Sequence, residues 1–193
     1  VISDYHVLKR FTEDASHEIQ TPLSIISARL ELLIQDRAIT GQQAEHIQAA
    51  FSATARLVKL TRSLLLLSKI ENNQFPDSEN VDLSIILLNQ LNLFTDLVKA
   101  KSLITEENIK TGCIRRVNIS LAETLITNLI NNAVRHSEPG SIIKVKLNGN
   151  SFVIVNTGKP LTVPAEKLFD RFYKVDRNSD SPGLGLSIVK KIC

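Results

Sequence analysis

His17 stands in the stretch "ASHEIQTPL" (15–23), where the spacing predicts an imidazole on the outer surface of a helix. At about 100° per helical residue, His17 points about 160° away from the apolar Ile19. Thr21 lies one turn further on the same face, and Glu18 is the direct neighbour. We therefore expect an exposed histidine with an acid and a hydroxyl beside it. The alternative is an ordinary surface histidine without chemistry.

Pro22 interrupts this helix five residues after His17. A proline has no N–H for the carbonyl of Glu18, and its ring crowds the preceding turn at a cost of about 3 kcal/mol. The helix should therefore bend just beyond His17. Such a bend could seat another domain against the histidine, or it could be a tolerated kink without function.

The stretch "NLINNAVRHS" (128–137) predicts a polar face on a second helix. Asn128, Asn132 and His136 follow one another at intervals of four, with Arg135 beside them. Carboxamide oxygens suit Mg²⁺ held jointly with phosphate oxygens, and an arginine can meet phosphate charge. Because asparagine is a mediocre helix former, this face indicates nucleotide binding. A merely solvated polar face is the alternative.

Glycines precede the last predicted helix in "SPGLGLSIVKK" (181–191), where Gly183 and Gly185 would expose backbone N–H groups to a phosphate. Taken alone this signal is weak. The sequence has neither a P-loop motif nor the strand and acidic residue of a dinucleotide-binding fingerprint.

Two long helices must position His17. Apolar residues alternate at spacings of three and four in both, with a glycine break in "TGQQ" (40–43) between them. Two helices alone leave much apolar surface exposed to water, so we expect a homodimer that forms a four-helix bundle. The seam residues are Ile19, Leu23, Ile26, Leu30 and Leu33 in the first helix, and Ala44, Ile47, Phe51, Thr54, Val58, Thr61, Leu65 and Ser68 in the second, widened by Leu57, Leu60, Leu64 and Leu67.

The periodicity stops in "ENNQFPDSEN" (71–80), which predicts a linker. Beyond it we expect a helix over 82–100 with Asp82 as N-cap and a helix over 120–136. The strands "IIKVKL" and "SFVIVN" flank an Asn-Gly hairpin turn at 148–149. Helices with antiparallel strands favour an α+β layer domain.

Composition restricts the function classes. A net charge of +3 with scattered basic pairs does not favour nucleic acid or an anionic membrane as partner. Two distant cysteines form no metal or disulfide pattern, which favours a reducing compartment. No apolar run approaches the length that spans a bilayer. Because the sequence begins at Val1 and contains no methionine, we expect a segment of a longer protein.

In this order, the motifs resemble those of bacterial two-component sensor histidine kinases. "FTEDASHEIQTPL" resembles the H-box, "NLINNAVRHS" the N-box, "VNTG" the first glycine box, "LFDRFYK" the F-box and "GLGLSIVKKI" the second glycine box. The resemblance implies a dimerisation and histidine-phosphotransfer hairpin at 1–76 and a gyrase-like ATP-binding α/β sandwich at 80–193. It also implies further strands after Cys193, which this sequence lacks.

The resemblance also implies roles for individual residues. His17 would be the phosphoacceptor, Glu18 would take its proton or orient its ring, and Thr21 would align a hydrolytic water in a phosphatase reaction. Asn132 would hold Mg²⁺. The other residues implied to contact ATP are Asn128, Arg135, His136, Asn156, Gly158, Arg171, Gly183 and Gly185, with Asn156 and Gly158 facing adenine and Arg171 reaching the γ-phosphate.

The family pattern further implies partners and a location. A response regulator would receive the phosphoryl group on an aspartate. The segment would lie in the cytoplasm, with the full-length protein anchored in the inner membrane. Asn156 departs from the pattern, because the family usually has an aspartate there, and the segment before Gly183 is short. A non-catalytic dimeric signalling scaffold with a degenerate nucleotide site is therefore the alternative function, and a gyrase-like ATPase without phosphohistidine is a third.

Overall fold

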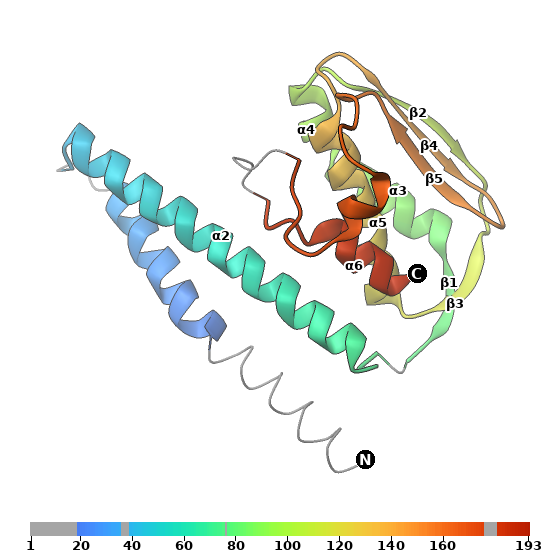
Figure 1. Ribbon diagram of the computed structural model, residues 1–193, viewed down its shortest axis with the longest axis horizontal. Helices are drawn as coiled ribbons and strands as arrows, with labels where there is room; N and C mark the ends of the chain where they lie inside the picture. The colour runs from blue at the N-terminus through green and yellow to red at the C-terminus, as the bar shows by residue number, and fades with distance from the viewer. Residues whose placement is uncertain (1–18, 36–38, 76, 176–180) are drawn as a thin grey trace, which may run out of the picture. The chain divides into compact units, whose positions relative to one another are not determined.

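The computed structural model describes residues 19–35, 39–75, 77–175 and 181–193 (Figure 1). The chain folds into two compact units. The first contains residues up to Gln74 together with Arg171–Leu184, and the second contains Phe75–Asp170 together with Gly185–Cys193. Each unit is therefore made of two stretches that are separated in the sequence.

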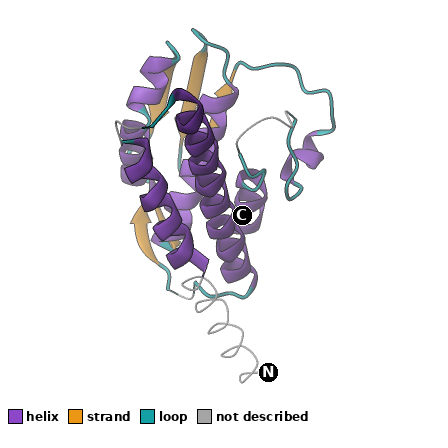
Figure 2. Cartoon of the chain, turned by 90° about the vertical axis from the view of Figure 1, so that its left-hand side faces the viewer, coloured by secondary structure: helices purple, strands orange, loops and turns teal. Residues whose placement is uncertain are grey.

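The first unit is built on a helical hairpin. Residues 19–34 form one helix and α2 (Gly41–Glu71) runs back beside it (Figures 1 and 2). Thr40 caps α2 through a capping box: the Gln43 N–H donates to Thr40 Oγ1 at 3.4 Å, and the Thr40 N–H donates to Gln43 Oε1 at 3.0 Å. The predicted break at "TGQQ" is therefore the start of α2.

Within one chain the apolar seam of this hairpin is only partly covered. Leu67 is 1% exposed and Leu23 is also buried, whereas Leu57 is 47% exposed. The other large apolar seam residues that remain exposed are Ile19, Ile26, Leu33 and Leu64.

The second unit contains a three-stranded sheet in the order β2–β4–β5. Strand β2 (Ile104–Ile109) pairs parallel with β4 (Ile142–Leu147), and β4 pairs antiparallel with β5 (Phe152–Asn156). The predicted hairpin between β4 and β5 is confirmed, but the sheet is mixed rather than antiparallel. We did not predict β2, nor the two-stranded ribbon of β1 (Glu79–Asp82) and β3 (Ile114–Val117).

The helix predicted over 82–100 is wrong in one respect, because it is broken at Phe94. Asp82 caps α3 (Leu83–Leu93) as predicted, accepting from the Ser84 N–H at 2.9 Å and its hydroxyl at 2.6 Å. These hydrogen bonds, led by the one from the Ser84 hydroxyl, hold the pKa of Asp82 below its usual value. At Phe94 the N–H turns to the carbonyl of Leu91, and α4 (Thr95–Ala100) begins after it. Phe94 packs against the core, so tertiary packing overrides the continuous helical pattern.

The core of the second unit lies between the sheet and helices α3 and α5 (Ile119–His136), which cover one face of the sheet (Figure 1). A short 3₁₀ helix, η1 (Ala165–Phe169), and α6 (Gly185–Ile192) complete the unit, and α6 packs against α5. Among the described helices, none is long and apolar enough to cross a bilayer. The most buried core residues are Leu87, Ile130, Ala133, Ile143 and Val145.

Candidate functional site

Helix α5 presents the predicted polar face because its opposite face is anchored in the core. Asn118 caps its first turn by accepting from the Leu121 N–H at 3.2 Å, and it donates to the Asp77 carbonyl at 2.9 Å. Ser137 ends the helix by donating from its hydroxyl to the Ala133 carbonyl at 2.7 Å. The buried face consists of Ala122, Ile126, Ile130, Ala133 and Val134. Leu125 and Leu129 of this helix are half-buried.

Asn128 has a fixed orientation on this helix. Its amide nitrogen donates to the Thr124 carbonyl at 2.9 Å, which leaves the amide oxygen facing the start of α6. A Cβ at Gly185 would lie 2.9 Å from that oxygen. Gly185 therefore makes room for the acceptor group of Asn128, and the structure brings these two predicted site residues together.

The first glycine box meets the other end of α5. A Cβ at Gly158 would lie 2.5 Å from the His136 carbonyl oxygen, and 3.4 Å from the Asn156 amide nitrogen. The Glu138 N–H also donates to the Thr157 carbonyl at 3.0 Å. His136, Asn156 and Gly158 thus come together at the C-terminal end of α5. Because the His136 carbonyl lies so close, only glycine fits at position 158.

Lys101 lies beside that end and was missed by sequence reasoning. Its ammonium group donates to two carbonyls of the last turn, Val134 at 3.0 Å and Arg135 at 2.7 Å, and to the carbonyl of the C-cap residue Ser137 at 3.4 Å. Partial burial lowers the pKa of His136, with smaller contributions from the charges of Arg135 and Lys101. The lowered pKa favours the neutral form of His136. No local pattern in the sequence connects Lys101 to carbonyl groups more than 30 residues further along the chain.

The residues expected to hold Mg²⁺ fit a shared site rather than a protein cage. Among the described residues, no three His, Cys, Asp or Glu side chains gather as a metal-ligand group. Asn132 is half-buried on the polar face of α5 and, within the described ranges, makes no side-chain hydrogen bond. An amide oxygen without a hydrogen-bond partner suits a Mg²⁺ ion that takes its remaining ligands from phosphates and water.

Two predicted residues, Arg171 and Gly183, belong to the first unit. The Arg171 guanidinium pairs with the carboxylate of Glu71, the last residue of α2. Gly183 has φ +74°, and a Cβ there would lie 2.8 Å from the backbone of Phe172, whose N–H donates to the Gly183 carbonyl at 2.9 Å. Glycine is thus required at 183 by the backbone itself. The proposed contact of Arg171 with phosphate stays a prediction.

The structure does not describe the predicted phosphoacceptor. His17 and Glu18 fall outside the described residues, and Thr21 is exposed on the helix at 19–34.

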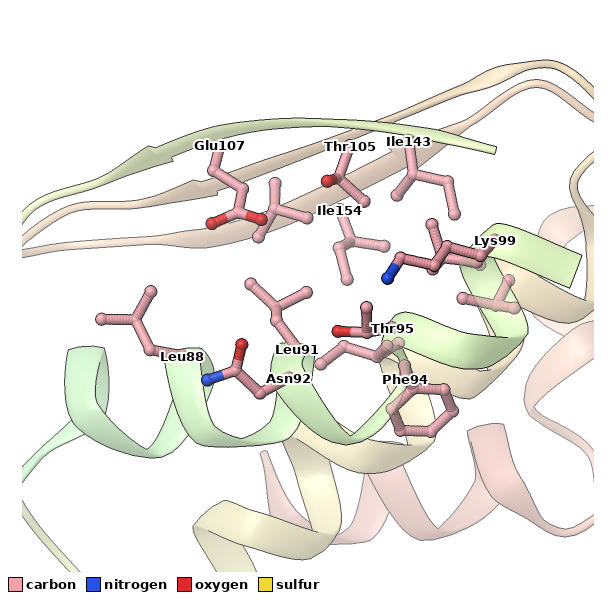
Figure 3. A pocket seen from close by; sticks show the side chains of 15 residues that line it. Leu88, Leu91, Asn92, Phe94, Thr95, Lys99, Thr105, Glu107, Ile143 and Ile154 are labelled. Carbon is pink, nitrogen blue, oxygen red and sulfur yellow. The ribbon is translucent and has the colours of Figure 1, made fainter. Parts of the chain in front are cut away.

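A separate cavity of about 240 Å³ lies in the second unit on the core side of α5. Figure 3 shows Glu107, Thr105 and Ile154 extending from the sheet toward Leu91 and Lys99 on the helices. Its α5 residues are the buried Ile130, Ala133 and Val134, so it is not the space in front of Asn128 and Asn132.

Comparison with known proteins gives a family match for the helical hairpin and another for most of the second unit. Residues 7–73 match the family described as "His Kinase A (phospho-acceptor) domain", and residues 118–193 match "Histidine kinase-, DNA gyrase B-, and HSP90-like ATPase". Heme sensor protein HssS of Staphylococcus aureus (strain JH9) is 33% identical over 198 residues, which cover 95% of this chain. The chain spans 41% of the length of that relative.

Solved structures share the fold. Full-length ShkA in complex with AMPPNP has a TM-score of 0.71 at 20% identity, covering 95% of this chain and 40% of that chain. The histidine kinase AdeS of Acinetobacter baumannii has a TM-score of 0.58 at 24% identity, covering 91% and 85%. The coarse prediction of a helical hairpin followed by an α/β ATPase domain is therefore confirmed.

Proposed function

The chain belongs to the sensor histidine kinases of two-component systems, and on that premise we propose that it transfers the γ-phosphoryl group of ATP to His17. The observation that carries the proposal is the polar face of α5, where Asn128 is oriented by Thr124 and given room by Gly185. A face that was merely solvated would need neither the fixed amide nor the missing side chain.

In the proposed first step, a neutral ring nitrogen of His17 attacks the γ-phosphorus in line. The new N–P bond forms as the bond to the β–γ bridging oxygen breaks, and ADP leaves with that electron pair. Glu18 accepts the ring proton or holds the ring in the reactive tautomer. A Mg²⁺ ion would neutralise phosphate charge, held by the amide oxygen of Asn132 together with phosphate oxygens.

We propose the remaining ATP contacts from the family resemblance, and the geometry at the ends of α5 supports those of Asn128, His136, Asn156, Gly158 and Gly185. Asn128 and Arg135 would meet phosphate oxygens, and neutral His136 would donate or accept a hydrogen bond at the ribose or phosphates. Asn156 and Gly158 would face the adenine. Gly183 and Gly185 would present backbone N–H groups, and Arg171 would reach the γ-phosphate after leaving Glu71.

We propose that the hairpin pairs with a second copy and that a response regulator takes the phosphoryl group. The exposed seam of α2 supports the pairing, because apolar side chains such as Leu57 stay in water within one chain. Phosphoryl transfer from His17 to an aspartate would regenerate the imidazole, and Thr21 would align the water that later hydrolyses the acyl phosphate. The domain boundaries, 1–76 and 80–193, remain part of this proposal, as do a cytoplasmic location of the segment and an inner-membrane anchor elsewhere in the full-length protein.

Asn156 favours a second candidate, a dimeric signalling scaffold without catalysis. An amide there can accept a hydrogen bond from the adenine amino group, but it carries no charge, so the bond is weaker than one to a carboxylate.

Incubation of the chain with γ-labelled ATP and Mg²⁺ separates the candidates. The kinase predicts an acid-labile, base-stable label that disappears in His17→Gln, while ATP affinity stays unchanged in that variant. ATP binding without label in the unsubstituted chain would favour the scaffold. Steady phosphate release that persists in His17→Gln would favour an ATPase without phosphohistidine.

A further inference from the structure

We propose that Lys101 is a positioning residue for nucleotide phosphates: its ammonium group fixes the last turn of α5, from which Arg135 and His136 project, and compensates the negative end of that helix. This inference rests on the proposed function, because it assigns a role within the same ATP site. Lys101 would contact neither ATP nor the reacting atoms.

The contact geometry supports an anchor rather than a loose surface lysine. The last four carbonyls of an α-helix have no partner within the helix. An ammonium group has three donors, and Lys101 directs its donors to the carbonyls of Val134, Arg135 and Ser137 at 2.7–3.4 Å. One side chain thus satisfies carbonyl groups that would otherwise require water or a different backbone turn.

The backbone of Lys101 is itself held from two directions. Its N–H donates to the Leu97 carbonyl at 3.2 Å, at the end of α4, and its carbonyl accepts from the Gly140 N–H at 3.1 Å. Gly140 lies in the loop that follows α5 and has φ +78°. Lys101 therefore connects α4, the last turn of α5 and the loop beyond it, which limits the movement of the turn that carries Arg135 and His136.

The charge of Lys101 adds an effect on phosphate that an uncharged anchor would not have. The C-terminal end of a helix carries roughly half a negative charge, which opposes an anion placed beside it. An ammonium group on the last carbonyls offsets this charge, and it also disfavours protonation of His136. Three other charged residues are close in sequence to His136 or to Gly158, which packs against it. They are Arg135 on the same helix, Glu138 in the following loop and Lys159 after Gly158.

The loss of affinity when Lys101 is replaced should depend on the ligand in different ways for a purely structural cap and for a phosphate-positioning residue. Loss of a cap alone would weaken all ligands of the site to the same extent. Loss of an anchor that acts on the phosphate contacts of Arg135 and His136 would weaken ATP and ADP more than adenosine.

The experiment compares Lys101→Met with Lys101→Arg in the full chain, and measures dissociation constants for ATP, ADP and adenosine by competition. Lys99→Met is the matched control, because Lys99 is an exposed lysine in the last turn of α4 and its ammonium group makes no hydrogen bond within the described residues. We expect Lys101→Met to weaken ATP and ADP binding roughly three- to tenfold more than adenosine binding. Lys101→Arg should retain most of the affinity, and Lys99→Met should match the unsubstituted chain.

A titration of His136 by NMR provides a second readout. Its pKa should rise in Lys101→Met and stay unchanged in Lys99→Met, because only the first substitution removes a cation that opposes protonation. If Lys101→Met does not fold, Lys101→Gln takes its place, since an amide can still donate to the helix carbonyls without the charge.

Equal weakening of all three ligands, or an unchanged ATP affinity together with an unchanged pKa of His136, would overturn the role of Lys101 while leaving ATP binding intact. If the unsubstituted chain binds none of the three ligands, the proposed function fails, and this inference fails with it.

Discussion

Helices α2 and α5 are stabilised in different ways. Over its 31 residues α2 buries only Leu67, whereas α5 buries five residues over 18. Helix α5 is packed on its own sheet and neighbouring helices, so one chain suffices to fix its polar face. Helix α2 keeps an apolar seam exposed within one chain, and this seam is the surface that the proposed dimer would cover. The polar face of α5 is thus fixed within one chain, whereas the proposed dimer would complete the packing of the hairpin.

The largest loss of stability should follow from a cavity on the buried side of α5, opposite its polar face. Ile130→Ala removes a side chain that is 2% exposed, and we expect it to lower the free energy of unfolding by about 2–5 kcal/mol. Leu57→Ala, at a half-exposed seam position, should cost much less in the isolated chain. Chemical denaturation of both variants measures the difference, and equal losses would contradict the contrast between the two helices.

The next effect concerns the exposed seam. Leu57→Lys combined with Leu64→Lys would place two ammonium groups in the proposed dimer interface, and we expect the dimer dissociation constant to rise at least a hundredfold, about 2.7 kcal/mol. Light scattering over a range of concentrations measures it. Gln48→Lys, at an exposed polar position of α2, is the control. A dimer that survives the double substitution would place the interface elsewhere.

Gly185→Ala tests the contact between α5 and α6. The added Cβ would lie 2.9 Å from the Asn128 amide oxygen, whose side chain is held by Thr124. We expect ATP binding to weaken by about 1–2 kcal/mol, because the displaced group is the tip of one side chain. Gly149→Ala, where a Cβ would meet nothing within 4 Å, is the control. Isothermal titration with ATP distinguishes them, and unchanged affinity would remove Asn128 from the site.

Thr40→Ala breaks the capping box of α2. Loss of an N-cap side chain costs about 1 kcal/mol, so the thermal midpoint of the hairpin should fall slightly while ATP affinity stays constant. Circular dichroism of the hairpin and nucleotide titration together check this. Reduced ATP affinity would show that the hairpin affects the nucleotide site more than the contrast between α2 and α5 allows.

The smallest effect should be the contribution of His136 to the pH dependence of the free energy of unfolding. Since its pKa is lowered in the folded chain, the neutral form is favoured there, and its contribution to stability is present above the ordinary value of 6.5 and is lost as pH falls through the lowered pKa. Urea unfolding below and above pH 6.5 should show this decline, and His136→Gln should reduce it. The same pH dependence in His136→Gln would assign it to other groups.

Sequence patterns determined those features that depend on local spacing. The start of α2 after Thr40, the polar spacing on α5, the Asp82 cap and the Asn-Gly hairpin are each encoded within a few residues, because caps, turns and helical faces depend on near neighbours. The motif order in addition identified the family and the candidate site residues.

Tertiary structure decided what no local pattern contains. Phe94 breaks a continuous helical pattern because it packs on the core, and β2 pairs with β4 across more than 30 residues of intervening chain. Lys101 reaches the end of α5 only because the fold brings the two together, and Gly158 must be glycine only because the His136 carbonyl lies against it. Contacts between residues far apart in the sequence depend on the packed whole, and that is the physical reason the sequence alone did not reveal them.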